Sequence, residues 1–359
     1  MPKIRVLVVD DAVVIRRMVS EVLDADPNFE VVGVASNGKI AVQKVTQVNP
    51  DAITLDVEMP EMNGLETVKA IRKTHPKLPI IMFSTLTEKG GWATLEALSE
   101  GANDYVTKPA NVGNVTEGLE RLKKDMIPKL KAQCPHLVQS PSASRSLFAN
   151  SGKSSAGRSR LPLTTRPDIL CIGTSTGGPN ALADLVQDLP VKLKIPVVLV
   201  QHMPPTFTLL LAERLNKLSP NKCVEARHGM PLENGCIYLA PGDKHMVVVR
   251  EGVSTRVELN EDPPENSCRP AVDVLFRSVS EIYGPKTLGV ILTGMGKDGL
   301  NGSEAIVENG GSVVAQDEES SVVWGMPGYV AEAGLAEKLL PLNEVGDYLL
   351  KRMGLYSAV

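Results

Sequence analysis

The chain has 359 residues, of which 43% are apolar and 22% charged, a composition typical of globular proteins and a length that suits two domains. Its net charge of −4 gives no reason to expect nucleic-acid binding, which usually requires a basic surplus. Neither a signal peptide nor a membrane-spanning run of roughly 20 apolar residues is recognisable, so membrane insertion is not expected. The five cysteines form no CxxC pair, which favours a reducing, cytoplasmic setting over a disulfide framework or a zinc site.

Short β-branched runs alternate with helical stretches in the first third of the chain. Amphipathic segments such as Ile15–Leu23 and Gly64–Lys73 lie between the runs. Near-continuous apolar strands followed by helices predict a parallel sheet covered on both faces, with ligands bound at the carboxyl ends of its strands. The predicted strands are Ile4–Val9, Glu30–Ala35, Ala52–Leu55, Ile80–Ser84 and Asp104–Thr107.

Polar side chains stand at the carboxyl ends of four of these strands. Asp10 and Asp11 follow the first strand, Asp56 follows the third, Ser84 ends the fourth and Lys108 comes just after the fifth. A single aspartate at a strand end is usually a helix cap, but five such groups favour a common site. Clustered carboxylates need a cation, and Mg²⁺ is the expected one. A carboxylate beside Mg²⁺, lysine and a hydroxyl can attack a phosphoryl group.

Three motifs, Val8–Asp11, Leu55–Gly64 and Tyr105–Pro109, resemble the response-regulator receiver family over residues 3 to about 125. The resemblance implies a flavodoxin-like fold in which a histidine kinase phosphorylates Asp56. It also implies Mg²⁺ ligands and a switch group. The implied ligands are Asp10, Asp11, Asp56 and the backbone carbonyl of Glu58, and the implied switch group is Ser84, Tyr105 and Lys108.

A segment of unusual composition divides the chain. Gln139–Arg160 contains eight serines, one proline and two glycines, its charged residues are all basic, and it lacks apolar periodicity. Such a stretch cannot bury enough apolar surface to become ordered and is therefore interpreted as a flexible linker. We predict a receiver domain over 1–125, a linker over 126–167 and a second, catalytic domain over 168–359.

The second domain repeats the alternation of strands and helices. We therefore predict a doubly wound, mainly parallel α/β fold, again with its chemistry at the carboxyl ends of the strands. The predicted strands are Ile169–Ile172, Val197–Gln201, Cys236–Leu239, Met246–Arg250, Leu288–Thr293 and Ser312–Gln316.

A serine, a histidine and an aspartate follow three of these strands. Ser175 lies in Gly173–Gly177, a G-x-S-x-G sequence that lifts a serine above a sheet at a strand-to-helix turn. A glycine-rich turn can also hold a phosphate, but this one lacks the lysine of a P-loop. His202 directly follows one strand, and Asp298 lies just past another. These three residue types suit a nucleophile, its base and the group that orients the base.

Each of the three residues also has an ordinary structural interpretation. A serine in a glycine-rich turn is often a cap, a histidine at a strand end is often a packing residue, and Asp298 before a glycine suits a turn. His228 and His245 are rival bases, but both lie in turns and rank lower, although His245 is a candidate to line the cleft.

Together, five segments resemble the catalytic domain of the chemotaxis protein-glutamate methylesterases, from about Asp168 to Leu350. With the receiver and the linker, the resemblance covers essentially the whole chain. The segments are Ile172–Pro179, Gln201–Pro204, Ala240–His245, Thr293–Gly299 and Gln316–Pro327.

The resemblance implies a serine hydrolase that removes methyl groups from γ-glutamyl methyl esters of chemoreceptors, releases methanol, and deamidates receptor glutamines. Ser175 is then the nucleophile, His202 the base, Asp298 its orienting group and the Met295 amide an oxyanion donor, with no metal or other cofactor at this site. The implied partners are chemoreceptors and a chemotaxis histidine kinase.

The two-domain organisation suggests regulation: an unphosphorylated receiver covers the cleft, and phosphate on Asp56 shifts the population toward an open arrangement. Two other functions remain open at this point. One is a signalling module whose second domain binds a ligand without catalysis, favoured only if Ser175, His202 and Asp298 do not converge. The other is a receiver with a DNA-binding output, which the acidic balance and the lack of a helix-turn-helix disfavour.

Overall fold

A computed structural model describes residues 2–109, 115–137 and 165–355 of the chain. The chain divides into two compact units, Met1–Leu161 and Pro162–Val359. The serine-rich segment Gln139–Arg160 lies outside the described residues, so the flexible linker stays a prediction.

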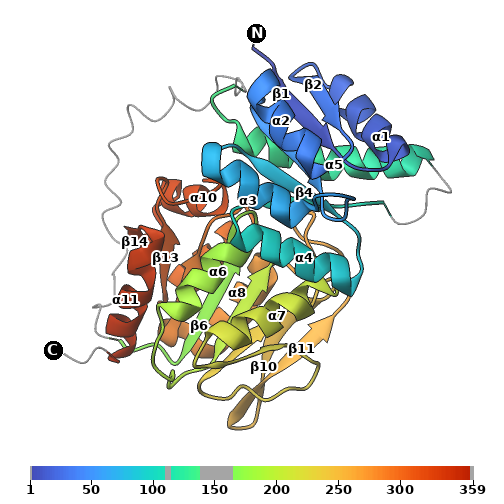
Figure 1. The fold of residues 1–359 in the computed structure, drawn as a ribbon. Helices are drawn as coiled ribbons and strands as arrows, with labels where there is room; N and C mark the ends of the chain where they lie inside the picture. Colours follow the sequence, from blue (N-terminus) through green and yellow to red (C-terminus); the bar gives the residue numbers. More distant parts are fainter. Residues whose placement is uncertain (1, 110–114, 138–164, 356–359) are drawn as a thin grey trace, which may run out of the picture. The chain divides into compact units, whose positions relative to one another are not determined.

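The first unit contains a five-stranded parallel sheet in the order β2-β1-β3-β4-β5 (Figure 1). Helix α1 contacts α5, whereas α2 contacts α3 and α3 contacts α4, so the helices form two layers. Its strands are β1 (Ile4–Val9), β2 (Phe29–Ala35), β3 (Ala52–Asp56), β4 (Ile80–Ser84) and β5 (Asp104–Thr107). Its helices are α1 (Val13–Asp24), α2 (Gly38–Val48), α3 (Gly64–Thr74), α4 (Glu88–Ser99) and α5 (Val115–Gln133).

Helix α5 continues beyond residue 125, the predicted end of the receiver domain, into the predicted linker. Met126, Ile127 and Leu130 are buried in the core that β1 and α1 also form. Their spacing of three and four residues keeps one apolar face of the helix against that core. Residues 126–133 are therefore part of the packed first unit.

The second unit is built around a seven-stranded parallel sheet in the order β14-β13-β12-β6-β7-β9-β8, with a separate antiparallel hairpin, β10-β11. The sheet strands are β6 (Ile169–Thr174), β7 (Val197–Gln201), β8 (Lys222–Glu225), β9 (Cys236–Leu239), β12 (Thr287–Ile291), β13 (Ser312–Gln316) and β14 (Ala336–Leu340). The hairpin strands are β10 (His245–Glu251) and β11 (Ser254–Asn260).

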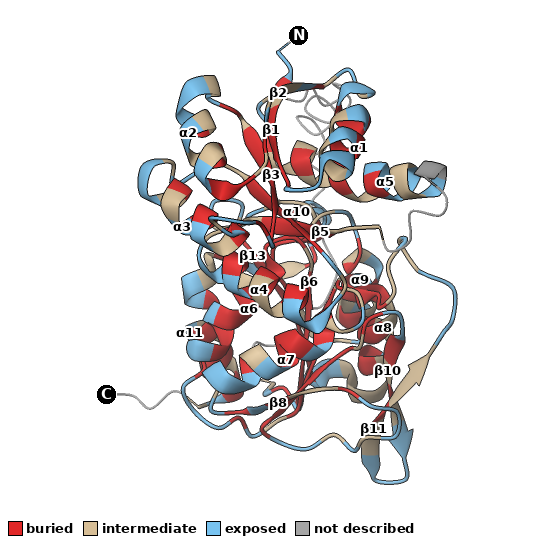
Figure 2. Ribbon diagram, turned by 45° about the vertical axis from the view of Figure 1, so that its right-hand side comes forward, coloured by how far each residue is buried: buried red, intermediate tan, exposed pale blue. Residues whose placement is uncertain are grey.

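Helices again form two layers in this unit. Helix α6 contacts α7 and α11, whereas α8 contacts α9, and α9 contacts α10. The central strands are buried, and the helices expose their outer faces (Figure 2). The helices are α6 (Gly178–Gln187), α7 (Phe207–Leu218), α8 (Val272–Tyr283), α9 (Leu300–Glu308), α10 (Met326–Glu332) and α11 (Leu342–Met353), and a 3₁₀ turn covers Gly284–Lys286.

Strand β6 marks the point where the winding of the second sheet reverses. The chain passes from β6 to β7 on one side, and later returns to β12 on the other side of β6. In parallel α/β sheets the crevice for ligands opens beyond the carboxyl ends of the strands at such a reversal. The residues that follow β6, β7 and β12 are therefore expected to form the ligand-binding or catalytic site of this unit.

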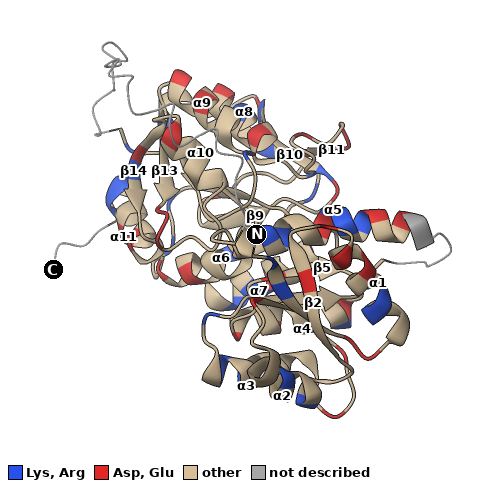
Figure 3. Cartoon of the chain, turned by 90° about the horizontal axis from the view of Figure 1, so that it is seen from above, with Lys and Arg blue, Asp and Glu red and all other residues tan. Residues whose placement is uncertain are grey.

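Two surface properties bear on the expected partners. Basic and acidic residues both occur along α1 and along α5, as Figure 3 shows. Within the described residues, no helix has the combined length and apolar character that crossing a membrane requires.

Candidate functional site

The turn after β6 fixes the backbone around Ser175. The Ser175 amide donates a hydrogen bond to the Thr293 carbonyl at 3.1 Å, which joins the ends of β6 and β12. The Ser175 carbonyl accepts hydrogen bonds from the Gly178 amide at 2.8 Å and from Nε2 of Gln201 at 2.9 Å. Gly178 has no room for a side chain, because a Cβ there would collide with the Gln201 and Thr174 side chains. The small residues of this motif thus permit a close turn that lifts Ser175 to the sheet edge.

His202 lies next to this turn. Its amide donates to the Thr174 carbonyl at 3.2 Å, and Nε2 of Gln201 approaches both the His202 and the Ser175 carbonyls. Nε2 of His202 is 2.8 Å from Oδ2 of Asp298. The structure therefore brings the three residues predicted from the sequence to neighbouring positions beyond β6, β7 and β12.

Asp298 is buried and accepts hydrogen bonds from backbone amides at the starts of α8 and α9. Its Oδ2 accepts from the Val272 amide at 2.7 Å, and its Oδ1 accepts from the amides of Asp273 and Gly299, both at 3.0 Å. Ala271, the residue before α8, has no side chain that can cap the helix. The Asp298 carboxylate instead accepts the hydrogen bonds of the first-turn amides. Asp298 therefore completes a helix and holds the histidine ring at the same time.

The charges of the pair are coupled. Burial raises the pKa of Asp298, but the hydrogen bonds from His202, Val272 and Asp273 outweigh that effect and hold the pKa below its ordinary value. Burial lowers the pKa of His202, but the hydrogen bonds with Asp298 and Cys268 outweigh it and raise the pKa above its ordinary value. The environment thus favours a carboxylate beside an imidazolium, the charge state that forms when the ring accepts a proton.

The second ring nitrogen of His202 has an unexpected neighbour. Nδ1 lies 3.6 Å from Sγ of Cys268. Among the described hydrogen bonds, none joins Oγ of Ser175 to His202, so the direct serine–histidine contact that the sequence suggests is not formed in this arrangement. In structures without substrate, the hydrogen bonds between catalytic side chains are often long or poorly aligned, and they tighten only when substrate binds.

The loop that carries Cys268 is tightly held. The amide and carbonyl of Cys268 pair with those of Glu265, and the two residues between them, Asn266 and Ser267, have positive φ angles of 52° and 63°. The Glu265 carboxylate receives two hydrogen bonds from Arg277 of α8, at 2.8 Å and 2.5 Å.

Two further polar residues complete the surroundings of Asp298. Nδ2 of Asn266 donates to Oδ1 of Asp298 at 3.1 Å and to Oδ2 of Asp273 at 2.9 Å. Asp273 is itself buried and accepts from the amides of Gly299 and Gly302. Sequence reasoning missed Asn266, Cys268 and Asp273 because none of them follows a strand of the sheet. Asp273, an acidic residue in the first turn of α8, was the one available signal.

The segment that contains Met295 lies beside the serine turn. The Gly294 amide donates to the Val323 carbonyl at 3.2 Å, and the Gly294 carbonyl accepts from the Met326 amide at 2.8 Å. Within the described part of the chain, no backbone carbonyl accepts a hydrogen bond from the Met295 amide. This N–H is thus available to a ligand, as the predicted oxyanion role requires.

The rival histidines have structural partners instead. His245 is buried, its Nδ1 accepts from the Ala271 amide at 3.2 Å, and its Nε2 lies 3.2 Å from the Pro263 carbonyl. Nδ1 of His228 accepts from the Leu259 amide at 3.2 Å. Neither forms a described hydrogen bond with Ser175 or Asp298, which agrees with their lower rank.

In the first unit, Lys108 joins the two carboxylates predicted to flank it. Its Nζ is 2.8 Å from Oδ2 of Asp10 and 2.8 Å from Oδ1 of Asp56. Burial and the neighbouring Asp10 raise the pKa of Asp56 to about 6, although the hydrogen bond from Lys108 opposes them. Asp11 is exposed and lies at the same cluster.

The acidic cluster fits a divalent cation. Oxygen atoms of Asp10, Asp11 and Asp56 lie within 4.8 Å of one another, and oxygen is the ligand type that Mg²⁺ prefers. Oδ2 of Asp56 is buried and has no hydrogen-bond partner among the described residues. A buried carboxylate oxygen without a partner costs free energy, which a bound cation or a phosphoryl group would recover. Glu58, whose backbone carbonyl was the further predicted ligand, donates its amide to Oδ1 of Asp56 at 3.4 Å.

The predicted switch residues lie on β4 and β5. The Ser84 hydroxyl is fully buried and contacts the Thr94 hydroxyl at 2.7 Å and the Gly90 carbonyl at 3.2 Å, both in α4. Tyr105 is also buried, and Nζ of Lys129 lies 4.9 Å from the centre of its ring. The Ser84 hydroxyl is thus hydrogen-bonded to α4, so a displacement of Ser84 would also alter its contacts with that helix.

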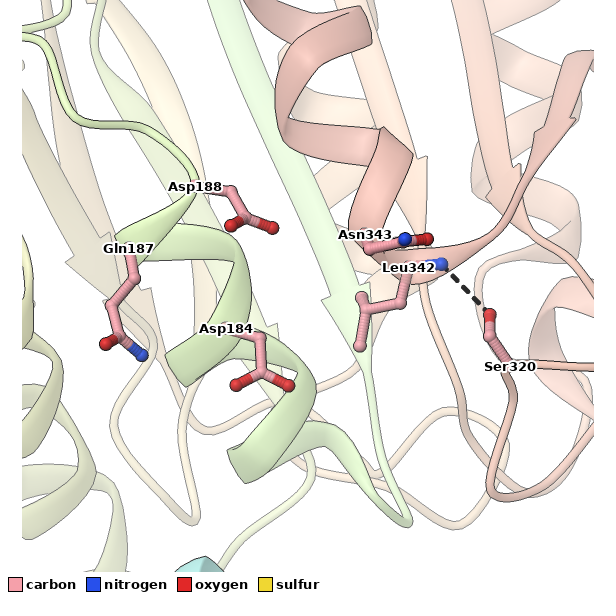
Figure 4. Close-up of a pocket in the computed structure, with 6 residues that line it drawn as sticks. All are labelled: Asp184, Gln187, Asp188, Ser320, Leu342 and Asn343. Carbon is pink, nitrogen blue, oxygen red and sulfur yellow. Dashed lines mark hydrogen bonds between the residues drawn. The ribbon is translucent and has the colours of Figure 1, made fainter.

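A cavity of about 460 Å³ lies beside α6 and α11 in the second unit (Figure 4). Ser320 accepts a hydrogen bond from the Leu342 amide at 3.0 Å at its edge. Burial raises the pKa of Asp184 and of Asp188, two acids in its wall. None of the residues predicted to act in catalysis lines it.

Comparisons with known proteins place these two sites in context. The CheB methylesterase family matches residues 170–349, and the response regulator receiver domain matches residues 6–120. A protein-glutamate methylesterase/protein-glutamine glutaminase of a Nocardioides species is 53% identical over 353 residues, covering 98% of this chain and 96% of the relative. Its counterpart in Trichodesmium erythraeum is 50% identical over 355 residues, covering 99% of this chain and 100% of the relative.

A solved structure agrees with the fold of the second unit. The Thermotoga maritima CheB methylesterase catalytic domain is 42% identical and superposes with a TM-score of 0.51, covering 52% of this chain and 98% of that domain. The fold class predicted from the sequence is confirmed in both units. The chain belongs to the CheB methylesterase family, with a response regulator receiver domain preceding its methylesterase domain.

Proposed function

We propose that this chain is a phosphorylation-activated hydrolase that removes methyl groups from glutamate γ-methyl esters of chemoreceptors and deamidates receptor glutamines. The observation that carries the proposal is the buried His202–Asp298 pair beside the Ser175 turn, at the point where the winding of the sheet reverses. Relatives that match over nearly the whole chain carry the corresponding name. We expect the reaction to take place in the cytoplasm.

In the proposed mechanism, Oγ of Ser175 attacks the ester carbonyl carbon, and His202 accepts the hydroxyl proton. Because Asp298 engages Nε2, the ring nitrogen left for this task is Nδ1, the reverse of the arrangement in the best-known serine proteases. The Met295 amide stabilises the developing oxyanion.

His202 then returns the proton to the leaving methoxide, and methanol departs. Water, deprotonated by His202, hydrolyses the acyl-enzyme to free glutamate. A glutamine substrate follows the same path and releases ammonia, because the amide differs chiefly in its leaving group. In this proposal Asp298 stabilises the positive charge that forms on the ring, and the Met295 amide stabilises the negative charge that forms on the substrate oxygen.

We propose that the receiver regulates this site through Asp56. Asp10, Asp11, Asp56 and the Glu58 carbonyl would hold Mg²⁺, which supplies charge neutralisation during phosphoryl transfer, while Lys108 binds the phosphoryl oxygens. Phosphorylation would shift the population from an arrangement that covers the cleft to one that leaves it open. A histidine kinase is the proposed phosphodonor.

Asp56→Asn tests the regulation. The variant lacks the carboxylate that accepts phosphate, so we expect its basal methanol release to persist while stimulation by a small-molecule phosphodonor and Mg²⁺ disappears. Methanol release from methylated receptor protein measures both rates. Asp24→Asn, an exposed aspartate on α1, serves as the matched control and should keep full stimulation. Equal stimulation of both variants would refute phosphorylation at Asp56.

The acidic limb of the pH profile tests the His202–Asp298 pair. The base must be neutral to accept a proton, and the pair raises the pKa of His202. We therefore expect kcat/KM to rise with pH and its midpoint to lie above about 6.5, the ordinary histidine value. Circular dichroism over the same range separates titration from unfolding. A midpoint below that value would contradict stabilisation of the imidazolium by Asp298.

A further inference from the structure

We propose that His202 and Cys268 form a binding site for a thiophilic divalent cation such as Zn²⁺, and that this cation inhibits the hydrolase. The geometry that carries the proposal is the separation of 3.6 Å between Nδ1 of His202 and Sγ of Cys268. In a tetrahedral site with a Zn–N distance of about 2.0–2.1 Å and a Zn–S distance of about 2.3 Å, nitrogen and sulfur lie about 3.6 Å apart. The observed separation therefore matches the one that a tetrahedral zinc ion requires of these two ligands.

The second ring nitrogen supports the same interpretation. A histidine that binds a metal almost always donates its other N–H to a carboxylate or carbonyl, which fixes the tautomer. Asp298 provides that acceptor at 2.8 Å from Nε2, so once the ring is neutral its lone pair is on Nδ1, the nitrogen next to the thiol. Asp298 thus acts as the outer partner of the metal ligand, without contacting the ion.

Both ligands are held in place before any ion arrives. Cys268 is clamped by its two backbone hydrogen bonds to Glu265, whose carboxylate is bound by Arg277. His202 is fixed by Asp298 and by its backbone bond to Thr174. Cys268 is also partly accessible, unlike Cys134, Cys171, Cys223 and Cys236, which are buried. A rigid and accessible pair loses little entropy when it binds an ion.

Binding replaces the thiol proton and the Nδ1 proton of the imidazolium: Zn²⁺, the Cys268 thiol and protonated His202 give a zinc–thiolate bond, a zinc–nitrogen bond and two released protons. The other coordination positions stay open to water. The inhibitory effect rests on the proposed function, because Nδ1 is the nitrogen proposed to accept the Ser175 proton. An ion on its lone pair removes the base.

The sequence gives no sign of this site. The two ligands are 66 residues apart and belong to no CxxC or HxxxH pattern. Only the fold brings the end of β7 to the loop before α8, which is why cysteine spacing alone argued against zinc.

The experiment uses the full-length protein, with Mg²⁺ present to occupy the carboxylate cluster of the receiver. Co²⁺, the spectroscopic substitute for Zn²⁺, is titrated in, and the thiolate-to-cobalt charge-transfer band is recorded. Carboxylates cannot produce this band, so it reports cysteine ligation and does not depend on esterase activity. We expect the band in the wild-type protein and in Cys134→Ala, and its loss in Cys268→Ala.

Methanol release with and without free Zn²⁺ is then measured for the same proteins, and a chelator should restore the wild-type rate. The ratio of the two rates is compared within each variant, so a changed basal rate does not matter. We expect Cys268→Ala to raise the inhibitory zinc concentration by at least about 10-fold. A missing band in the wild type, or equal zinc sensitivity of Cys268→Ala, would overturn the proposal. A band without any methanol release would retain the metal site and refute the proposed function.

Discussion

Replacing Ser175 with alanine is expected to abolish methanol release from methylated receptors, with or without a phosphodonor. The alanine lacks the only hydroxyl proposed to attack the ester, so the acyl-enzyme cannot form. Loss of the nucleophile in serine hydrolases typically lowers kcat by about 10⁶-fold, and the residual rate comes from binding and oxyanion stabilisation. The measurement is methanol released per enzyme under saturating methylated receptor.

Folding controls accompany this variant. The Ser175 contacts in the turn come from its backbone amide and carbonyl, so the substitution should leave the melting temperature nearly unchanged. Ser254→Ala, an exposed serine at the start of β11, is the matched control and should retain the wild-type rate. Methanol release by folded Ser175→Ala at the wild-type rate would show that Ser175 is not the nucleophile. No release by the wild-type protein under any condition, with a validated substrate, would return the second domain to a ligand-binding role without catalysis.

The second large effect is expected for Asp298→Asn, which should lower both catalysis and stability. The asparagine amide cannot orient and stabilise the imidazolium as a carboxylate does, and such a change costs about 10⁴-fold in kcat in a well-studied serine protease. Its NH₂ group would also face backbone donors that now reach a carboxylate oxygen. A buried donor left without an acceptor costs about 1–3 kcal/mol, so the free energy of unfolding should fall by that amount.

Rates of methanol release and urea-induced unfolding of the same preparation measure the two effects together. Asp262→Asn, an exposed aspartate in the loop before α8, is the control and should change neither. If Asp298→Asn lost stability but kept its rate, the carboxylate would be a helix cap and nothing more. If it lost rate but not stability, the hydrogen bonds to Val272 and Asp273 would contribute little to folding.

Strand-end residues were predictable from the sequence because strand ends are marked by local patterns. Buried apolar runs identified β6, β7 and β12, and parallel packing brings their carboxyl ends together, whatever the intervening sequence. Ser175 and His202 follow such runs directly, and Asp10 and Asp56 do so in the receiver. Asp298 lies seven residues after β12, yet the glycines around it marked a turn.

Other features depend on contacts between distant segments. Strands β8 and β14 lie at the two edges of the second sheet, and half-exposed edge strands lack the continuous apolar run that identifies central ones. Strand β10 was recognised by its apolar residues, but its antiparallel pairing with β11 was not. Cys268 and Asn266 reach His202 and Asp298 from a loop that no periodic pattern describes, so only the folded chain reveals them.

Backbone amides at the starts of α8 and α9 offer a way to follow the charge on His202 without changing its side chain. The amide protons of Val272, Asp273 and Gly299 all bond to the carboxylate that faces His202. When the imidazole gains or loses a proton, the electron density on that carboxylate shifts, and the resonances of these three amides should move with it in NMR spectra. These amides thus form a natural reporter that can follow the charge on the histidine in the free protein and after substrate is added.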